Sequence, residues 1–265
     1  MNNTFNTKRF GKLVKKTFLE RPAQMFGFTG LLLALTLILY SIIKAFGGFN
    51  PAQNITFIWG LAGGGCFLAS FVFGYFSSNA MGSTFLTLPA SNFEKWLCGV
   101  LIAGVFYPVI FLLFFRLVDS SFVAIYHNGL DPLGPFYKQQ YESVYIFDFN
   151  GFLAWKVYPI FGVLAGAMLV GSLYFNKVTF IKTAISLTIV FIGVFGLNWL
   201  IAFVLFGHIN DAVPFNHVTI PVGKEEGSIE LPSGIINNFF NNSIWYVLPP
   251  ILWLLAFTRL REKEF

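Results

Sequence analysis

Few residues in this sequence have the types and spacing that chemistry at a protein site requires. The three histidines, His127, His208 and His217, could bind a metal together with Asp211, because imidazole nitrogens and carboxylate oxygens are common zinc ligands. They form no recognised metal-binding motif, so we expect ordinary surface histidines. The sequence therefore predicts neither a metal site nor another cofactor.

The glycine triplet Gly63, Gly64 and Gly65 invites comparison with a phosphate-binding loop. No Gly-Lys-Ser/Thr sequence follows it, and it lies inside a long apolar stretch, so we expect no nucleotide there. Neither His-Glu-x-x-His nor Gly-x-Ser-x-Gly occurs, which removes the usual zinc and serine routes to hydrolysis. Cys66 and Cys98 lie in apolar runs and indicate no disulfide framework. We expect no catalytic residues and no enzyme activity on this chain.

The composition indicates the class of protein to which these residues belong. Of the 265 residues, 56% are hydrophobic and only 11% are charged, against about 25% charged residues in an average soluble domain. Thirty-five phenylalanines could not be hidden in one soluble core of this size. The composition therefore predicts an integral membrane protein, surrounded by membrane lipid and without a nucleic-acid partner.

Six stretches are long and apolar enough to cross a bilayer. A transmembrane helix needs about 20 mostly apolar residues, because a hydrocarbon core of about 30 Å is crossed at about 1.5 Å per residue. The stretches are residues 25–46, 55–76, 96–118, 152–175, 180–206 and 244–260. We therefore expect an all-α, polytopic protein whose six-helix transmembrane domain occupies residues 25–265.

The segments between these spans differ in length. Residues 77–95 form an inward segment, whereas two outer loops, residues 119–151 and 207–243, each exceed thirty residues. In the second outer loop, apolar residues alternate on both sides of a turn at residues 223–227: Val218, Ile220 and Val222 before it, Ile229 and Leu231 after it. This alternation predicts a small extracytoplasmic β-hairpin over residues 217–231.

Prolines are the main irregularity within the spans, which carry almost no charge. The prolines are Pro108, Pro159, Pro249 and Pro250, in the third, fourth and sixth stretches. Each is expected to bend its helix. The basic residues Lys44, Arg116, Lys156 and Lys182 all fall near span ends. Ion-coupled carriers place ionisable groups deep inside the bilayer, so we expect no proton or sodium coupling.

Glycine pairs with four-residue spacing occur in two of the spans. They are Gly60 and Gly64 in the second, and Gly162 and Gly166 in the fourth. This small-xxx-small spacing lets helix backbones approach closely. We expect these glycines to pack helices within the chain, with a subunit interface as the alternative.

The distribution of basic residues predicts the orientation. Six crossings place twelve of the 17 Lys and Arg residues and four of the 12 acidic residues on the side of the two termini. The net charge is therefore +8 on that side and −3 on the other. Because basic residues concentrate in cytoplasmic loops, both termini are expected in the cytoplasm.

Residues 1–24 are expected to form a cytoplasmic amphipathic helix. At 100° per residue, Phe10, Leu13, Val14 and Phe18 fall on one arc. The opposite, membrane-surface arc carries Lys8, Lys12, Lys15 and Lys16. The apolar arc could lie in the cytoplasmic leaflet while the lysines meet anionic headgroups. Alternatively, these charges fix the topology and do nothing else.

The end of the inward segment is locally well defined. Ser91 and Glu94 form a capping box, so a helix is expected to begin here and to continue into the third span. The Leu88-Pro89 turn precedes this helix start. The local pattern thus predicts a rigid corner facing the cytoplasm.

This corner resembles the Leu-Pro-x-Ser corner of permease subunits of ABC exporters of the second type. The residues that carry the resemblance are Leu88, Pro89, Ala90, Ser91, Asn92, Phe93, Glu94 and Lys95. The basic amphipathic N-terminal helix, the six spans and the charged end at residues 259–264 are similar too, so the resemblance covers the whole length. The sizeable loop after the third span departs from the family pattern.

The resemblance implies a function carried by a complex. A separate ABC ATPase subunit would dock on the inward segment, and a second permease chain would complete the pathway. The location implied is a bacterial cytoplasmic (inner) membrane, crossed several times. The alternative is a non-transporting structural or assembly protein that binds a partner through its outer loops.

Overall fold

Five long apolar helical stretches dominate the computed structural model, which describes residues 5–175, 177–207, 209, 211–214, 217–222, 225–230, 243 and 245–263. Within that part of the chain, the stretches long and apolar enough to cross a membrane are Met25–Gly47, Phe49–Val72, Asn92–Asn128, Phe152–Tyr174 and Thr179–Phe206. They overlap the first five stretches expected from the sequence. The chain is accordingly a polytopic helical membrane protein.

Three of these stretches contain π-helical turns. The first joins η1 (Ala23–Gly27) to α2 (Phe28–Gly47). The second is built from α3 (Phe49–Ile58), η2 (Trp59–Gly63) and α4 (Gly64–Val72). The third is built from α6 (Asn92–Leu101), η4 (Ile102–Phe106) and α7 (Tyr107–Asn128). Pro108 lies in the first turn of α7, where a missing backbone N–H is tolerated.

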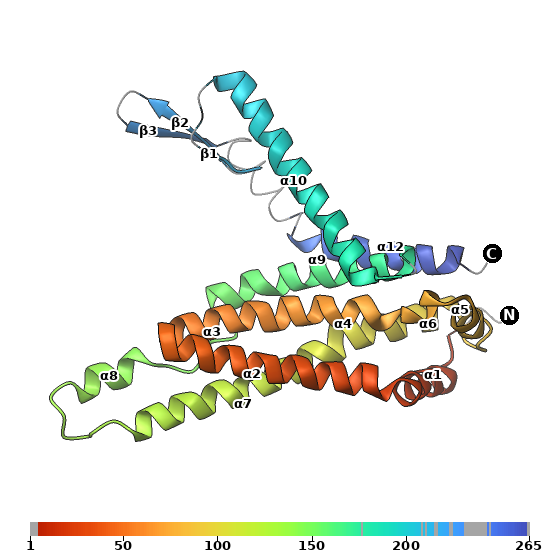
Figure 1. Cartoon of the computed structure of the whole chain (residues 1–265), viewed down its shortest axis with the longest axis horizontal. Coiled ribbons are helices and arrows are strands. Elements are labelled where there is room, and N and C mark those ends of the chain that lie inside the picture. The colour runs from red at the N-terminus through yellow and green to blue at the C-terminus, as the bar shows by residue number, and fades with distance from the viewer. Residues whose placement is uncertain are drawn as a thin grey trace.

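Figure 1 shows α2, α3, α4, α6, α7 and α9 (Phe152–Tyr174) lying alongside one another as a bundle. Both termini lie at one end of the bundle, which we call the proximal end. Helices α1 (Thr7–Glu20) and α5 (Asn79–Leu86) lie at this end, and η3 (Gly74–Ser77) connects α4 to α5. The opposite, distal end carries α8 (Tyr137–Ser143).

Aromatic side chains fill the core of the bundle. Phe57 of α3 and Tyr107, Phe111 and Phe115 of α7 are completely buried. Neighbouring rings lie 5.4 to 6.1 Å apart, within the range of favourable aromatic contacts. Helix α9 packs against α4 and also against α12 (Leu248–Glu262).

The third span continues well beyond the stretch expected from the sequence. The helix does not stop at Val118 but runs to Asn128, so residues 119–128, expected to begin the outer loop, are helical. Gly129 stands at the C-cap of this longer helix. Asp119, expected at the start of the outer loop, lies inside α7 and is completely buried.

The second span is shifted towards the N-terminus relative to the expected residues 55–76. It begins at Phe49 and ends at Val72. Pro51 stands in the first turn of α3, where its missing backbone N–H is tolerated. At the other end, the helix gives way to η3, so the inward segment begins at Phe73 and contains the helix α5.

The sixth expected span is represented in the described residues by α12, which has 15 residues. A helix of that length rises only about 22 Å, less than a hydrocarbon core of about 30 Å. Pro249 and Pro250 were expected to bend this span from within. They lie instead in the first turn of α12, where proline is tolerated. Residue 244, where the stretch was expected to begin, lies outside the described residues.

The expected hairpin is present as part of a small antiparallel sheet of order β1-β2-β3. Strand β2 (His217–Val222) pairs with β3 (Glu225–Glu230), and β1 (Asp211–Ala212) pairs with β2. The turn is shorter than expected, because pairing continues to Val222 opposite Glu225. Residues 223, 224 and 231 lie outside the described residues.

Helix α10 (Thr179–Phe206) is inclined away from the bundle in Figure 1. Its 28 residues extend about 42 Å, and inclination is a common way to fit a long helix into a bilayer. The side chain of Asn198 donates from Nδ2 to the carbonyl oxygen of Ala212 at 3.1 Å. This bond fixes β1 against α10.

Candidate functional site at the proximal end

The corner between α5 and α6 is organised by the predicted capping box. The Ser91 amide donates to Glu94 Oε2 at 2.8 Å, and the Glu94 amide donates to Ser91 Oγ at 3.2 Å. The two bonds are reciprocal, so both ends of the box are satisfied. Helix α6 begins at Asn92. This local prediction is confirmed.

Glu94 also binds the first helix. The amide of Asn6, the residue that caps α1, donates to Glu94 Oε1 at 2.8 Å. Arg9 donates from Nε to Oε2 and from Nη2 to Oε1, both at 2.8 Å. The carboxylate thus lies at the N-termini of two helices, where a negative charge is favourable. Its bonds raise the pKa of the Arg9 guanidinium above the ordinary value, which keeps Arg9 protonated.

Lys95 fixes the other side of the corner. Its side chain is almost completely buried, and Nζ donates to the carbonyl oxygen of Leu86 at 2.8 Å. Leu86 ends α5, so the ammonium group satisfies a C-terminal carbonyl and lies where the helix dipole favours a cation. Glu94 and Lys95 together attach α1 and α5 to the start of α6.

The remaining predicted corner residues lie in the turn before α6, at positions 88–90, and at the start of α6, at positions 92 and 93. The amide of Ala90 donates to the Leu88 carbonyl oxygen at 2.7 Å, and Ala90 is buried while Pro89 is exposed. Phe93 is exposed and its ring lies 5.5 Å from that of Trp96. Asn92 is half-buried at the first position of α6.

The amphipathic N-terminal segment is helical from Thr7 to Glu20. Lys8, Lys12 and Lys15 are exposed, and Lys16 pairs with Glu20 at 3.2 Å.

The apolar arc of α1 faces the protein. Leu13 is buried in the core cluster, to which Phe10, Val14 and Phe18 also belong as partly buried members. The ring of Phe18 lies 4.9 Å from that of Phe106. The end of the bundle thus supplies apolar partners for this arc, which the isolated helix pattern lacks. Contact of its partly buried members with the cytoplasmic leaflet stays a prediction.

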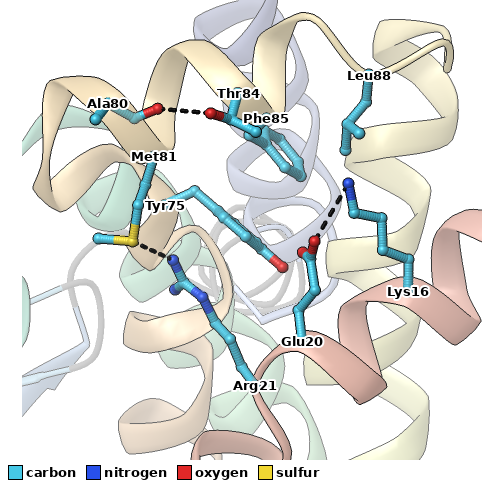
Figure 2. Close-up of a pocket in the computed structure, with 9 residues that line it drawn as sticks. All are labelled: Lys16, Glu20, Arg21, Tyr75, Ala80, Met81, Thr84, Phe85 and Leu88. Atoms are coloured by element: carbon cyan, nitrogen blue, oxygen red, sulfur yellow. Dashed lines mark hydrogen bonds and ion pairs between the residues drawn. The ribbon is translucent and has the colours of Figure 1, made fainter.

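A groove of about 380 Å³ lies between α1 and α5 (Figure 2). The rings of Tyr75 and Phe85 are stacked inside it at 4.6 Å. Arg21 lies 3.8 Å from the centroid of the Tyr75 ring and donates to Met81 Sδ at 3.2 Å. Burial raises the pKa of the Tyr75 phenol, so Tyr75 stays neutral. An apolar interior with charged groups on α1 suits a protein side chain better than a small ion.

The four predicted packing glycines lie at tight contacts between helices of this chain. A Cβ atom on Gly60 would meet the Phe111 ring, and one on Gly64 would meet the Tyr107 hydroxyl. Positions 162 and 166 face α12 in the same way: a Cβ atom on Gly162 would meet Pro249, and one on Gly166 would lie 2.6 Å from the Trp253 ring. A large aromatic side chain fills the space above Gly60, Gly64 and Gly166, and a proline ring fills it above Gly162. The tight packing was predictable from the spacing, but its partners were not.

His127 and His217, the two histidines that the structure describes, each lie beside a different partner. The ring of His127 stacks on Tyr141 at 3.9 Å, and His217 Nε2 lies 4.0 Å from Asp211 Oδ2. His208 lies outside the described residues. Among the described residues there is no group of three His, Cys, Asp or Glu side chains that could hold a metal ion. Cys66 and Cys98 are free and buried.

The chain was compared with known protein families, curated proteins and solved structures. No protein-family description matches the chain, and neither a curated protein nor a solved structure matches it. The chain is a polytopic helical membrane protein with five helices of membrane-spanning length in its described residues and a braced helical corner at its proximal end.

Proposed function

We propose that this chain is the membrane-spanning permease subunit of an ATP-driven ABC exporter that works with a separate ATPase subunit. The observation that carries the proposal is the attachment of α5 to the third span. Helix α5 lies at the proximal end of the bundle (Figure 1), and Lys95 bonds its C-terminal end to α6, whose start is fixed by the Ser91–Glu94 capping box. Force applied to α5 would pass directly into the longest helical stretch of the protein.

The corner fits the role of an ATPase docking site better than that of a simple loop. A loop that only connects two spans needs no buried charges, yet Glu94 and Lys95 are almost completely buried. The partly exposed Arg9 pairs with Glu94 and joins α1 to the same point. Burying such charges is costly unless they are paired, so the arrangement suits a segment that must keep its shape under load. The adjacent groove offers space for a side chain of the ATPase.

The proposed topology has six crossings and cytoplasmic termini in a bacterial inner membrane. Both termini lie at the proximal end, which an even number of crossings requires (Figure 1). In this arrangement α12 forms the inner part of the sixth crossing. The side with the net charge of +8 is then cytoplasmic, as the positive-inside rule expects. A second permease chain would complete the transport pathway.

Site-specific photo-crosslinking tests the proposal. A photoreactive amino acid at Thr84, exposed on α5, is expected to capture a chain that carries a Gly-x-x-x-x-Gly-Lys-Ser/Thr phosphate-binding loop in membranes of the native host. The matched control is the same amino acid at Leu133, which is 94% exposed in the distal loop. Capture at Leu133 but not at Thr84 would contradict the permease assignment. It would favour the assembly protein that binds through its outer loops.

A further inference from the structure

An extended segment closes the distal end of the bundle. Residues 144–149, here called the strap, have no regular secondary structure and lie between α8 and α9. Phe147 is the buried residue of the strap, and its ring lies 4.6 Å from Phe57 and 5.5 Å from Phe115. Both of these rings are completely buried. The strap thus covers the distal end of the aromatic core.

Asp119 is the central attachment point of the strap. Its Oδ2 accepts a hydrogen bond from the Phe147 amide at 2.7 Å. Its Oδ1 accepts from Tyr40 Oη at 2.7 Å and from Gln53 Nε2 at 2.8 Å. One carboxylate oxygen therefore holds the strap, while the other is bound by α2 and α3.

The other attachments also use helix side chains and strap backbone. Gln53 Nε2 donates to the Tyr145 carbonyl oxygen at 2.8 Å, and Arg116 Nη1 donates to that of Phe147 at 3.0 Å. Tyr158 Oη donates to the Phe149 carbonyl oxygen at 3.0 Å. Side chains of three different helices, α3, α7 and α9, thus bind a strap that is not part of a sheet.

We infer that the strap is a releasable seal over the distal end of the bundle, fastened by Asp119. The strap lacks the cooperative ladder of backbone bonds that a sheet provides, and Tyr145, Ile146 and Asp148 are exposed. If the strap lifts, Asp119 keeps its bonds to Tyr40 and Gln53, so no buried charge is left without a donor. Lifting uncovers Phe57 and Phe115 on the distal side. This device does not depend on the proposed ATPase partner.

A pair of isosteric substitutions tests the fastening. Asp119→Asn keeps one acceptor oxygen for Tyr40 and Gln53 but places an NH₂ group opposite the Phe147 amide, and two donors cannot bond. Asp148→Asn makes the same chemical change on the strap itself, where the side chain is exposed and bonds only within its own turn, to the Asn150 amide.

Hydrogen exchange in lipid nanodiscs measures release directly. In the wild-type protein, the amides of residues 144–149 are expected to exchange faster than those of α7 and α9, because the strap opens locally. Asp119→Asn is expected to accelerate strap exchange about tenfold, as loss of a bond to a charged group predicts. Asp148→Asn is expected to leave the rate unchanged. Equal strap exchange in Asp119→Asn and wild type would overturn the proposal, as would uniform acceleration of α3, α7 and α9.

A cysteine reporter measures the seal. Phe57→Cys is placed in a background with Cys66→Ala and Cys98→Ala, and a charged, water-soluble thiol reagent is added. The reagent is expected to react slowly with the Phe57→Cys thiol. When Asp119→Asn is also present, the reaction is expected to be about tenfold faster, as for hydrogen exchange in the strap. Rapid reaction with the strap intact would mean that the strap seals nothing. If the reporter variant does not fold, the exchange measurement still decides.

Discussion

The guanidinium of Arg9 and the carboxylate of Glu94 join two helices whose contacting residues stand 85 positions apart in the sequence. The pair lies at the proximal end, where Glu94 also completes the capping box of α6. A single carboxylate therefore sets the start of α6 and the position of α1. Any movement of the corner would be transmitted to α1 through this side chain.

Arg9→Ala is expected to loosen α1 from the bundle, because Glu94 then loses its side-chain donors from α1 and Leu13 loses its fixed position. The measurement is the reaction of Cys98, which lies beneath Thr17 at 3.8 Å. Its labelling by a thiol reagent in detergent is expected to become faster, while the thermal unfolding temperature falls. Cys66, buried between the spans, provides an internal reference that stays unreactive.

Lys12→Ala is the matched control for Arg9→Ala, since Lys12 is an exposed cation on the same helix. It is expected to change neither Cys98 labelling nor the unfolding temperature. Equal effects of the two substitutions would mean that the charge of α1, and not its bond to Glu94, holds it in place.

The double variant Ser91→Ala with Pro89→Gly is expected to insert normally yet lose ATPase association or permease-dependent ATP turnover. Ser91→Ala removes one cap bond at a cost of about 1 kcal/mol, and Pro89→Gly loosens the turn before it. Neither change alters an apolar span. The measurements are membrane insertion, co-purification of the ATPase and ATP hydrolysis.

Ser186→Ala is the control for this double variant, because Ser186 is an exposed hydroxyl on α10, far from the corner in sequence. It is expected to behave as wild type. Unchanged association and turnover in the double variant would remove the corner from the mechanism.

Local patterns in the sequence predicted the elements of this protein well. Ser91 and Glu94 are three residues apart, so their capping box is recognisable from the spacing of the two residue types alone. Hydropathy over about 20 residues located five of the helical stretches, although their ends differ by up to ten residues. The capping box and the apolar spans can both be predicted because each depends only on residues that are close together in the sequence.

Contacts between distant segments could not be predicted in this way. The donors of Asp119 come from Tyr40, Gln53 and the backbone of Phe147, three separate segments, so the isolated charge indicated the end of a span. For the same reason, Arg9 was only one of the twelve basic residues counted on the side of the termini. A charged side chain can be buried in a helix only where hydrogen-bonding partners surround it. The tertiary fold brings those partners together, so the sequence alone does not show them.

Replacing Gly64 or Gly166 with Leu is expected to destabilise the bundle by about 1–3 kcal/mol through overpacking. Each glycine faces a large side chain, Tyr107 in one case and Trp253 in the other, which leaves no room for a leucine. The measurement is the unfolding temperature in detergent and the yield of monodisperse protein.

Gly193→Leu is the control for these variants, because a Cβ atom at Gly193 would meet no neighbour within 4 Å. It lies on α10 and is expected to leave stability within about 0.5 kcal/mol of wild type. Wild-type stability of all three variants would show that Gly64 and Gly166 do not lie in tight contacts.

The orientation predicts opposite labelling of the two ends of the bundle. In a background with Cys66→Ala and Cys98→Ala, Lys138→Cys in α8 and Thr84→Cys in α5 both place a thiol at an exposed position. Because the side that carries α5 has a net charge of +8, it is expected in the cytoplasm. A membrane-impermeant maleimide should therefore label Lys138→Cys in intact cells and label Thr84→Cys only after permeabilisation. The reverse pattern would invert the topology, and labelling of both thiols in intact cells would contradict the placement of α5 and α8 on opposite sides of a membrane.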